Sequence, residues 1–288
     1  MGAMLGRQRS GSVLCPSCGS LVGVGDDRCL TCGRLRPGLW GFAALLRRTG
    51  DDMGFLTLVL AACGALYVAT LASGTPRAGG GLMGLLAPDS RALLQFGMTG
   101  AVPVFGLGRW WTVLSACWLH GDLLHIVFNM LAARTLIPAV AHLYGPARTV
   151  IVWVLAGACG ALLSSAVGWG LPGLPQLLHG SQFSIGASGC VFGLLGALAY
   201  YGRRGGSRHL ADYAWQWVLY GAVYGLVSSN IDNWGHAGGF LGGWLVSRWL
   251  DPLLPERGDH VLVAVALLAL SAVSVLASLL LDVPGLAR

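Results

Sequence analysis

The sequence predicts an all-α polytopic membrane protein with a small cysteine-containing module at its N-terminus. The chain has 288 residues, of which 55% are hydrophobic and only 10% are charged, whereas a soluble domain usually carries about 25% charged residues. Its 45 glycines are typical of membrane helices that pack closely, because small residues let helix backbones approach one another. The apolar residues also fall into separate stretches long enough to form membrane helices.

The N-terminal module contains two Cys-x-x-Cys turns, Cys15-Pro16-Ser17-Cys18 and Cys29-Leu30-Thr31-Cys32, each followed by glycine. Four thiolates in two such turns suit tetrahedral zinc, and the glycines permit the tight turns that aim backbone amides at sulfur. Two disulfides are the alternative, which a reducing cytosol disfavours. The segment resembles a short zinc ribbon. We therefore expect structural zinc on Cys15, Cys18, Cys29 and Cys32, in a module over 1–36 that a linker over 37–53 joins to the rest.

Seven apolar segments follow the linker, and each is expected to be a helix, because a spanning segment must satisfy all its backbone groups internally. They lie at about 54–72, 113–135, 148–168, 186–202, 212–229, 235–250 and 260–281. The sixth is short, but it is rich in glycine and can be buried among its neighbours.

Arginine positions indicate the orientation of these helices. The net charge of +6 comes from arginine alone, and the arginines are scattered between apolar segments, which favours a topological role over binding of nucleic acid. The N-terminus lacks the apolar stretch of a signal peptide, so we expect it in the cytosol. Arginines then concentrate in the cytosolic loops, in agreement with the positive-inside rule.

In this topology the polar residues gather at the outer ends of three helices. Ser188, in Gly186-Ala187-Ser188-Gly189, begins the fourth helix, and His236 begins the sixth. Serine needs a base to take its proton, and histidine is the usual one. A helix N-terminus at Ser188 offers free N–H groups to a developing oxyanion. His125 and Asn129 are four residues apart, so they share one helix face and can donate further hydrogen bonds.

Four motifs follow one another along the chain: Gly-Arg109-Trp110, His120-x4-His125-x3-Asn129, Gly186-x-Ser188-Gly189 and Gly-His236-x-x-Gly239-x-x-x-Gly243. This ordered combination resembles the rhomboid family of intramembrane serine proteases. The resemblance covers about 54–250 and implies a six-helix core, with an additional membrane helix and tail over 251–288.

The resemblance also implies roles for individual residues. Ser188 would be the nucleophile and His236 the general base, with His125, Asn129 and the Ser188 N–H as oxyanion donors. Arg109 and Trp110 would belong to the outer-loop motif, and they also suit anchoring at the membrane interface. Phe192 replaces the tyrosine that is common beneath the catalytic histidine, and a phenyl ring can still stack on imidazole. Gly186 would let substrate approach closely.

Several residues allow a second reading. The glycines around Ser188 could serve close helix packing alone, and we assign Gly239 and Gly243 to packing. His120 could contact the oxyanion region, although ordering of the outer end of its helix is favoured. Asp232, four residues before His236, could complete a triad, although capping of the sixth helix is favoured.

Taken together, the sequence predicts a serine endopeptidase that cleaves transmembrane or membrane-adjacent segments of other membrane proteins. It needs no metal for catalysis, and it sits as a multi-pass protein in a membrane, expected to be the bacterial inner membrane, with its active site toward the outer face. A cytosolic protein partner of the zinc module is possible, and no nucleic acid is expected. The alternatives are a non-catalytic rhomboid relative that escorts membrane proteins, which usually lacks the serine or the histidine, and a transporter, which the near absence of deep charges disfavours.

Overall fold

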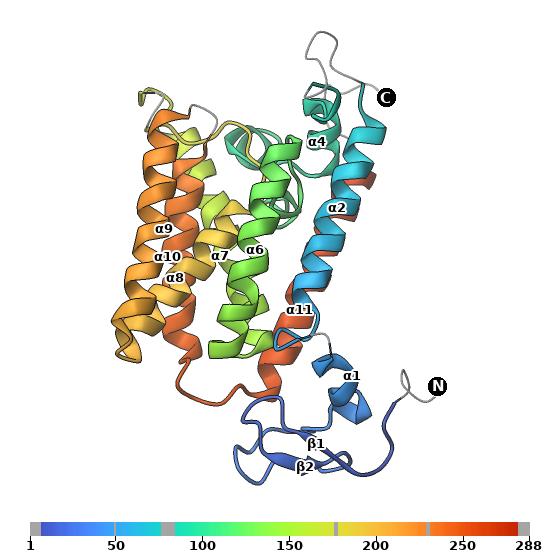
Figure 1. Ribbon diagram of the computed structural model, residues 1–288. Coiled ribbons are helices and arrows are strands. Elements are labelled where there is room, and N and C mark those ends of the chain that lie inside the picture. Colours follow the sequence, from blue (N-terminus) through green and yellow to red (C-terminus); the bar gives the residue numbers. More distant parts are fainter. Residues whose placement is uncertain (1–6, 49, 76–83, 176–177, 229–230, 282–288) are drawn as a thin grey trace.

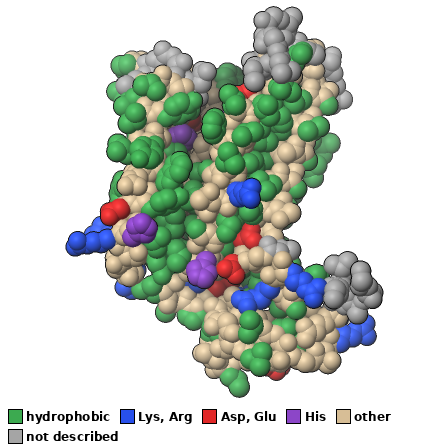
Figure 2. Space-filling model, in the orientation of Figure 1, with side chains coloured by type: hydrophobic (Ala, Val, Ile, Leu, Met, Phe, Trp, Pro, Cys, Tyr) green, Lys and Arg blue, Asp and Glu red, His purple; other side chains and the backbone are tan. Residues whose placement is uncertain are grey.

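The computed structural model describes residues 7–48, 50–75, 84–175, 178–228 and 231–281, and shows a helical bundle with a small module at one end (Figure 1). The first six residues of the predicted zinc module and the last seven of the predicted C-terminal tail lie outside this range. Hydrophobic side chains cover much of the helical surface in Figure 2, while most arginines on that face lie in its lower half. The chain is a polytopic helical membrane protein.

The seven predicted helices are all present. They are α2 (Phe55–Ser73), α6 (Leu123–Tyr144), α7 (Pro146–Gly170), α8 (Ser188–Arg204), α9 (Arg208–Val227), α10 (Asn233–Leu250) and α11 (Gly258–Leu280). Among the described residues, four of these helices are long and apolar enough to cross a membrane by length and composition: α2, α6, α7 and α11. The other three helices are shorter or more polar, and α8 and α10 are buried because they pack against α7 and against each other.

The second helix begins ten residues later than predicted, at position 123 rather than 113. Asp122 accepts a hydrogen bond from the His125 N–H at 2.8 Å and so caps the N-terminus of α6. The apolar residues before it form short turns instead, and these connect to the outer-loop elements. The elements of this region are α4 (Ser90–Phe96), η2 (Val102–Gly106), α5 (Thr112–Ser115) and η3 (Ala116–Trp118).

Close packing between α8 and α10 depends on glycine. A Cβ atom on Gly239 would lie 2.2 Å from the carbonyl oxygen of Gly189, and one on Gly243 would lie 2.0 Å from that of Gly193. Both distances are far below van der Waals contact, and the clashing atoms are backbone atoms that cannot rotate away. These two glycines therefore set the separation of α8 from α10, and with it the separation of Ser188 from His236.

The N-terminal module contains an antiparallel pair, β1 (Ser12–Leu14) and β2 (Leu21–Gly23), with Val13 opposite Val22. Two short elements follow, η1 (Leu39–Gly41) and α1 (Ala43–Arg47). Ala43 packs with Val13 and Val22 in a small hydrophobic core. That core therefore includes a residue from the segment predicted as a linker.

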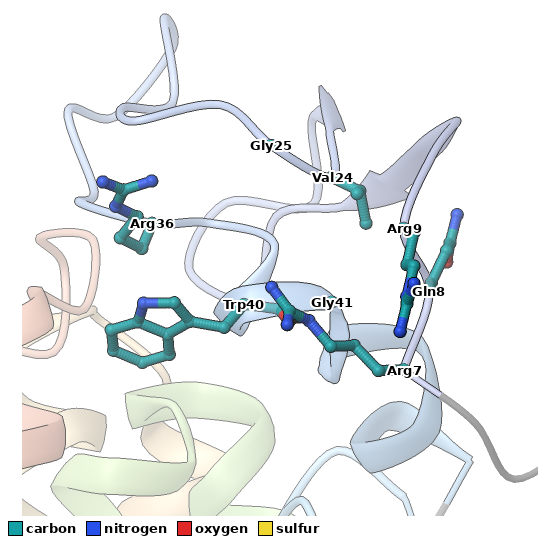
Figure 3. A pocket seen from close by; sticks show the side chains of 8 residues that line it. All are labelled: Arg7, Gln8, Arg9, Val24, Gly25, Arg36, Trp40 and Gly41. Atoms are coloured by element: carbon teal, nitrogen blue, oxygen red, sulfur yellow. Dashed lines mark hydrogen bonds between the residues drawn. The ribbon is translucent and has the colours of Figure 1, made fainter.

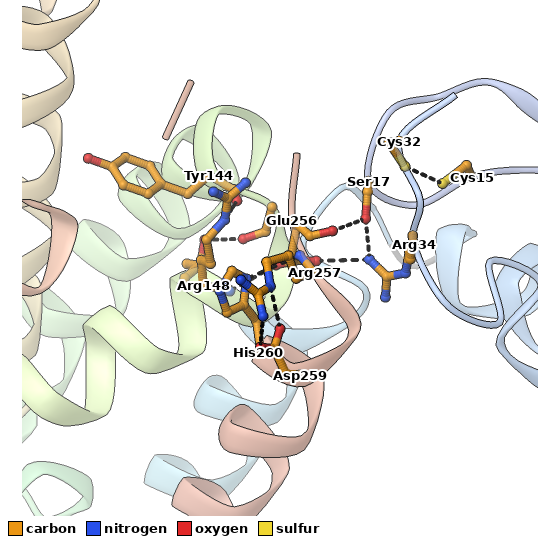
Figure 4. Close-up of polar contacts among 12 residues, drawn as sticks. Cys15, Ser17, Cys32, Arg34, Tyr144, Arg148, Glu256, Arg257, Asp259 and His260 are labelled. Carbon is orange, nitrogen blue, oxygen red and sulfur yellow. Dashed lines mark hydrogen bonds and ion pairs between the residues drawn. The ribbon is translucent and has the colours of Figure 1, made fainter. Parts of the chain in front are cut away.

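The module is joined to the bundle through Glu256, in the segment between α10 and α11 (Figure 4). Arg34 forms an ion pair with Glu256 at 3.3 Å, and both side chains are only 1% exposed. The Ser17 hydroxyl donates to the backbone carbonyl oxygen of Glu256 at 2.5 Å. Arg34 pairs with Oε2 of the Glu256 carboxylate, and Oε1 accepts the Arg148 backbone N–H at 2.9 Å. Burial raises the pKa of Glu256, although the Arg148 N–H and the charges of Arg34 and Arg148 act in the opposite direction.

Candidate active site

Ser188 is the first residue of α8 and is half-buried. Gly186 precedes the helix with φ at +122°, a conformation that favours glycine, and a Cβ atom there would lie 2.5 Å from Nε2 of His125. No side chain caps α8, and the N–H groups of its first three residues have no backbone or side-chain partner among the described residues. The start of α8 therefore presents a hydroxyl together with free N–H donors.

His236 lies in the first turn of α10, and its ring is stacked on Phe192. The ring centroids are 4.1 Å apart, and the planes are inclined by only 8°. Phe192 is one turn along α8 from Ser188, so the stack holds the imidazole against the helix that carries the hydroxyl. Both residues are described, and no hydrogen bond joins the Ser188 hydroxyl to the His236 ring. Such contacts are often loose before substrate binds. The expected stacking of Phe192 is confirmed.

His125 and Asn129 lie on successive turns of α6, and His120 lies just before that helix. The Asn129 amide donates to the His125 carbonyl oxygen at 2.9 Å. The rings of His120 and His125 meet edge to face with centroids 5.1 Å apart. His120 is fully buried, and neither of its ring nitrogens has a partner among the described residues. His125 thus lies close to both Gly186 and His120.

Asp232 caps α10, as favoured from the sequence, and does so within a network that the sequence did not predict. Its carboxylate accepts hydrogen bonds from the Ser164 and Ser184 hydroxyls, both at 2.6 Å, and from the Gly235 N–H at 2.8 Å. The carboxylate thereby ties α10 to α7 and to the segment before α8. Ser164 and Ser184 carry no sequence signal, because serine is common both in membrane helices and in the loops between them.

Arg109 and Trp110 do not contact the other candidate residues through any hydrogen bond in the described chain. Arg109 is buried and donates to the Leu94 carbonyl oxygen at 2.8 Å and to the Ser278 carbonyl oxygen at 2.9 Å. Trp110 is exposed. Arg109 therefore joins α4 to the end of α11, and the exposed indole of Trp110 is compatible with an anchor at the membrane interface.

The part of the chain that carries these residues matches a protein-family model. The Rhomboid domain model matches residues 107–251, which contain the start of α6, Ser188 and His236. The chain belongs to the rhomboid family.

Curated relatives of this rhomboid come from bacteria, plants and protozoa. Rhomboid protease GluP of Bacillus subtilis is 33% identical over 168 residues, 57% of this chain and 31% of the relative. RHOMBOID-like protein 1 of Arabidopsis thaliana is 26% identical over 177 residues, 56% of this chain and 40% of the relative. Rhomboid-like protease 5 of Toxoplasma gondii is 26% identical over 168 residues, 55% of this chain and 18% of the relative. The matched part thus spans less than half of each of these three proteins.

The four predicted cysteine ligands of this rhomboid come together at the other end of the molecule. The sulfur atoms all lie within 4.8 Å of one another, with Cys15 to Cys32 at 3.7 Å and Cys18 to Cys29 at 3.6 Å. A tetrahedral zinc with bonds of about 2.3 Å places its sulfur ligands about 3.8 Å apart, so the cluster can hold such an ion. All four are free cysteines, which is not the disulfide arrangement.

Glycine completes both cysteine turns as expected. Gly19 and Gly33 have φ of +75° and +72°, and each donates its N–H to the carbonyl oxygen of the first cysteine of its turn, at 2.9 and 2.8 Å. The two turns have the same geometry, so they bring two pairs of sulfur atoms together as a compact cluster that can hold a metal ion.

Proposed function

We propose that this rhomboid is an intramembrane serine endopeptidase in which Ser188 is the nucleophile and His236 is the general base. The stack of Phe192 on His236 supports this proposal most directly. It fixes the imidazole plane against α8, one turn from the serine, while the glycines of α10 keep the two helices in contact. A hydroxyl with a positioned imidazole and free N–H groups beside it provides the parts of acyl transfer.

In the proposed reaction the Ser188 Oγ attacks the carbonyl carbon of the scissile peptide bond, and His236 accepts the hydroxyl proton. The tetrahedral intermediate collapses when the C–N bond breaks, and His236 returns the proton to the leaving amine. Water then attacks the acyl-enzyme with His236 again acting as base, which releases the second product and restores the Ser188 hydroxyl.

The negative charge on the intermediate needs donors that are already in place. The Ser188 N–H at the start of α8 is one, and we propose His125 and Asn129 as side-chain donors. The Cβ distance from Gly186 puts the His125 ring beside the backbone that leads into Ser188. Asn129 already uses one N–H on the His125 carbonyl oxygen, so the second N–H of its amide serves the oxyanion.

The substrates we propose are transmembrane or membrane-adjacent segments of other membrane proteins, which unwind locally to expose a carbonyl carbon. We place the N-terminus in the cytosol and the site toward the outer face of a bacterial inner membrane, on the distribution of arginines. The Cys15, Cys18, Cys29 and Cys32 cluster is proposed to hold structural zinc, which would not enter the reaction. We also propose that a cytosolic protein binds this module.

The proposal is tested by cleavage of a reporter transmembrane helix with purified full-length protein in bilayers. Ser188→Ala and His236→Ala should each abolish turnover, because nucleophile and base act as a unit. Cys190→Ala is a matched control in the same helix, and it should keep activity. A fluorophosphonate reagent should label the wild-type protein and not Ser188→Ala. Full turnover by a well-folded Ser188→Ala protein would exclude the serine mechanism.

A further inference from the structure

We propose that the N-terminal module carries a binding site for the phosphate group of an anionic phospholipid, in a pocket bounded by Arg7, Arg9, Arg36 and Trp40 (Figure 3). The pocket has a volume of about 510 Å³, enough for a headgroup. We call it the basic pocket. It lies apart from the four cysteines and at the opposite end of the molecule from Ser188 and His236.

The charge of the basic pocket is of one sign. Three of its lining residues are arginines and none is acidic; the rest of the lining is Gln8, Val24, Gly25 and Gly41. The planar guanidinium group offers paired donors that match phosphate oxygens. Arg36 pairs with Asp27 at 2.8 Å, but both side chains are largely exposed, so this pair is weak and can exchange for a ligand.

Two of the arginines have donors available. Arg7 uses Nε on the Trp40 carbonyl oxygen at 2.7 Å, which orients its guanidinium group at the opening. Its terminal nitrogens and the whole Arg9 guanidinium group have no hydrogen-bond partner within the described part of the chain. Figure 3 shows the Arg7 and Arg9 side chains approaching the same space from one side of the pocket. Like charges brought together in this way favour an anion between them.

Trp40 supplies the second, independent observation. Its φ is +53°, a left-handed conformation that is costly for a bulky residue. Its indole gains little packing in return, because Trp40 is 61% exposed. A strained residue that displays an aromatic ring at the rim of a pocket indicates a site for a ligand. An indole beside arginines suits the headgroup level of a bilayer, where tryptophan is enriched.

The position of the module brings the basic pocket to the membrane surface. The Arg34–Glu256 ion pair holds the module against the end of the bundle, and Trp40 precedes the first residue of α2, Phe55, by only fifteen residues, several of which are coiled in α1. Phe42, two residues after Trp40, is also exposed. Because the pocket combines an indole ring with arginines next to a membrane helix, we assign the phosphate to a lipid and not to a soluble ion.

Hydrogen–deuterium exchange of the full-length protein in nanodiscs tests this assignment. One arm uses phosphatidylcholine alone, a second adds about 30% phosphatidylglycerol, and a third adds millimolar inorganic phosphate to phosphatidylcholine. The amides of residues 36 and 38–41 should exchange at least about 5-fold more slowly in the phosphatidylglycerol arm only, since each arginine near an anionic surface contributes about a factor of 5. Equal slowing by inorganic phosphate would overturn the lipid assignment.

Charge-matched variants separate the basic pocket from general attraction to the surface. The triple variant of the pocket, Arg7→Gln with Arg9→Gln and Arg36→Gln, should lose the slowing by phosphatidylglycerol. A control triple variant removes three exposed arginines at the same end of the molecule and should keep the slowing; it combines Arg28→Gln, Arg203→Gln and Arg208→Gln. The single Arg9→Gln variant breaks no hydrogen bond of the described chain, so it should fold normally and reduce the slowing about 5-fold at most. Loss of the effect in both triple variants alike would contradict the proposal.

Discussion

The position of a single ring sets the geometry of the proposed catalytic pair. His236 lies flat against Phe192, and Phe192 in turn faces Gly221 of α9, where a Cβ atom would lie 2.3 Å from the end of the phenyl ring. The ring thus occupies a slot between α9 and α10 that leaves no room for a larger neighbour. A tyrosine at position 192 would direct its hydroxyl group at the same crowded glycine.

Phe192→Leu is predicted to reduce the rate of cleavage by about 3- to 10-fold, because stacking between flat rings is worth about 0.5–1.5 kcal/mol. Leucine keeps most of the apolar volume, so the melting temperature should change little. Single-turnover cleavage and thermal unfolding measure the two effects separately. A rate equal to that of the wild type would mean that the stack does not position His236.

At the scale of the elements, contact between α8 and α10 decides whether the site is assembled. The backbone of α8 stands where a Cβ of Gly239 or Gly243 would lie. Asp232 adds a polar tie at the start of α10, through the two serines. One helix pair therefore carries both proposed catalytic residues and is held by small-residue packing along its length.

Gly239→Ala is predicted to lower the stability of the protein by about 1–3 kcal/mol, which is typical of overpacking, and to reduce cleavage by displacing His236. Gly64→Ala is the matched control: it lies within α2, and a Cβ there meets no atom within 4 Å. Alanine at that position should be neutral or stabilise the helix by about 0.5–1 kcal/mol. Melting temperatures in the same detergent compare the two variants, and equal shifts would contradict the packing argument.

Particular elements explain how far the sequence predicted this structure. Helices α2, α7 and α11 are continuous apolar stretches, so hydropathy locates them well. The predicted start of α6 was wrong because residues 113–119 are as apolar as the helix itself, and only the cap at Asp122 marks where the helix begins. The stack on His236 followed from the family resemblance. The ties from Ser164 and Ser184 to Asp232 were beyond prediction, because they join three segments through single polar atoms.

On the scale of the whole molecule, the cysteine cluster and the proposed catalytic pair lie at opposite ends. His236 lies in the first turn of α10 and the Glu256 segment follows the end of that helix, so about 20 Å of helix separates His236 from the Glu256 segment. α11 returns from that segment, and Ser278 near its far end accepts hydrogen bonds from both Arg109 and Trp111. The additional helix thus contacts the module region at one end and the outer-loop elements at the other.

Removal of the proposed zinc is predicted to unfold the N-terminal module and leave the helical bundle intact. A module this small has too little core to fold alone, and structural zinc contributes about 10–16 kcal/mol of apparent binding free energy in small finger peptides. After chelation, limited proteolysis should cut within residues 12–35, while the helical circular dichroism signal persists. Elemental analysis should give about one zinc per chain, and none for Cys15→Ser with Cys18→Ser.

Cleavage of a simple reporter helix should survive chelation, since the cluster is remote from Ser188. Loss of cleavage by chelator in a protein that already lacks residues 1–45 would instead indicate a catalytic metal. Asp27→Asn, which removes only an exposed ion pair of the module, is the control that should leave both metal content and protease resistance unchanged.

The ion pair between Arg34 and Glu256 has a consequence for how the protein is made. Its partners are separated by 222 residues, so the ribosome finishes the cysteine module long before the carboxylate exists. During synthesis the module is therefore undocked, with the Arg34 guanidinium group in water. Docking becomes possible only after α10 has been inserted and the segment that carries Glu256 has been synthesised. A nascent chain stopped before residue 256 therefore lacks the contacts that Arg34 and Ser17 make with Glu256, and this sets it apart from a finished chain.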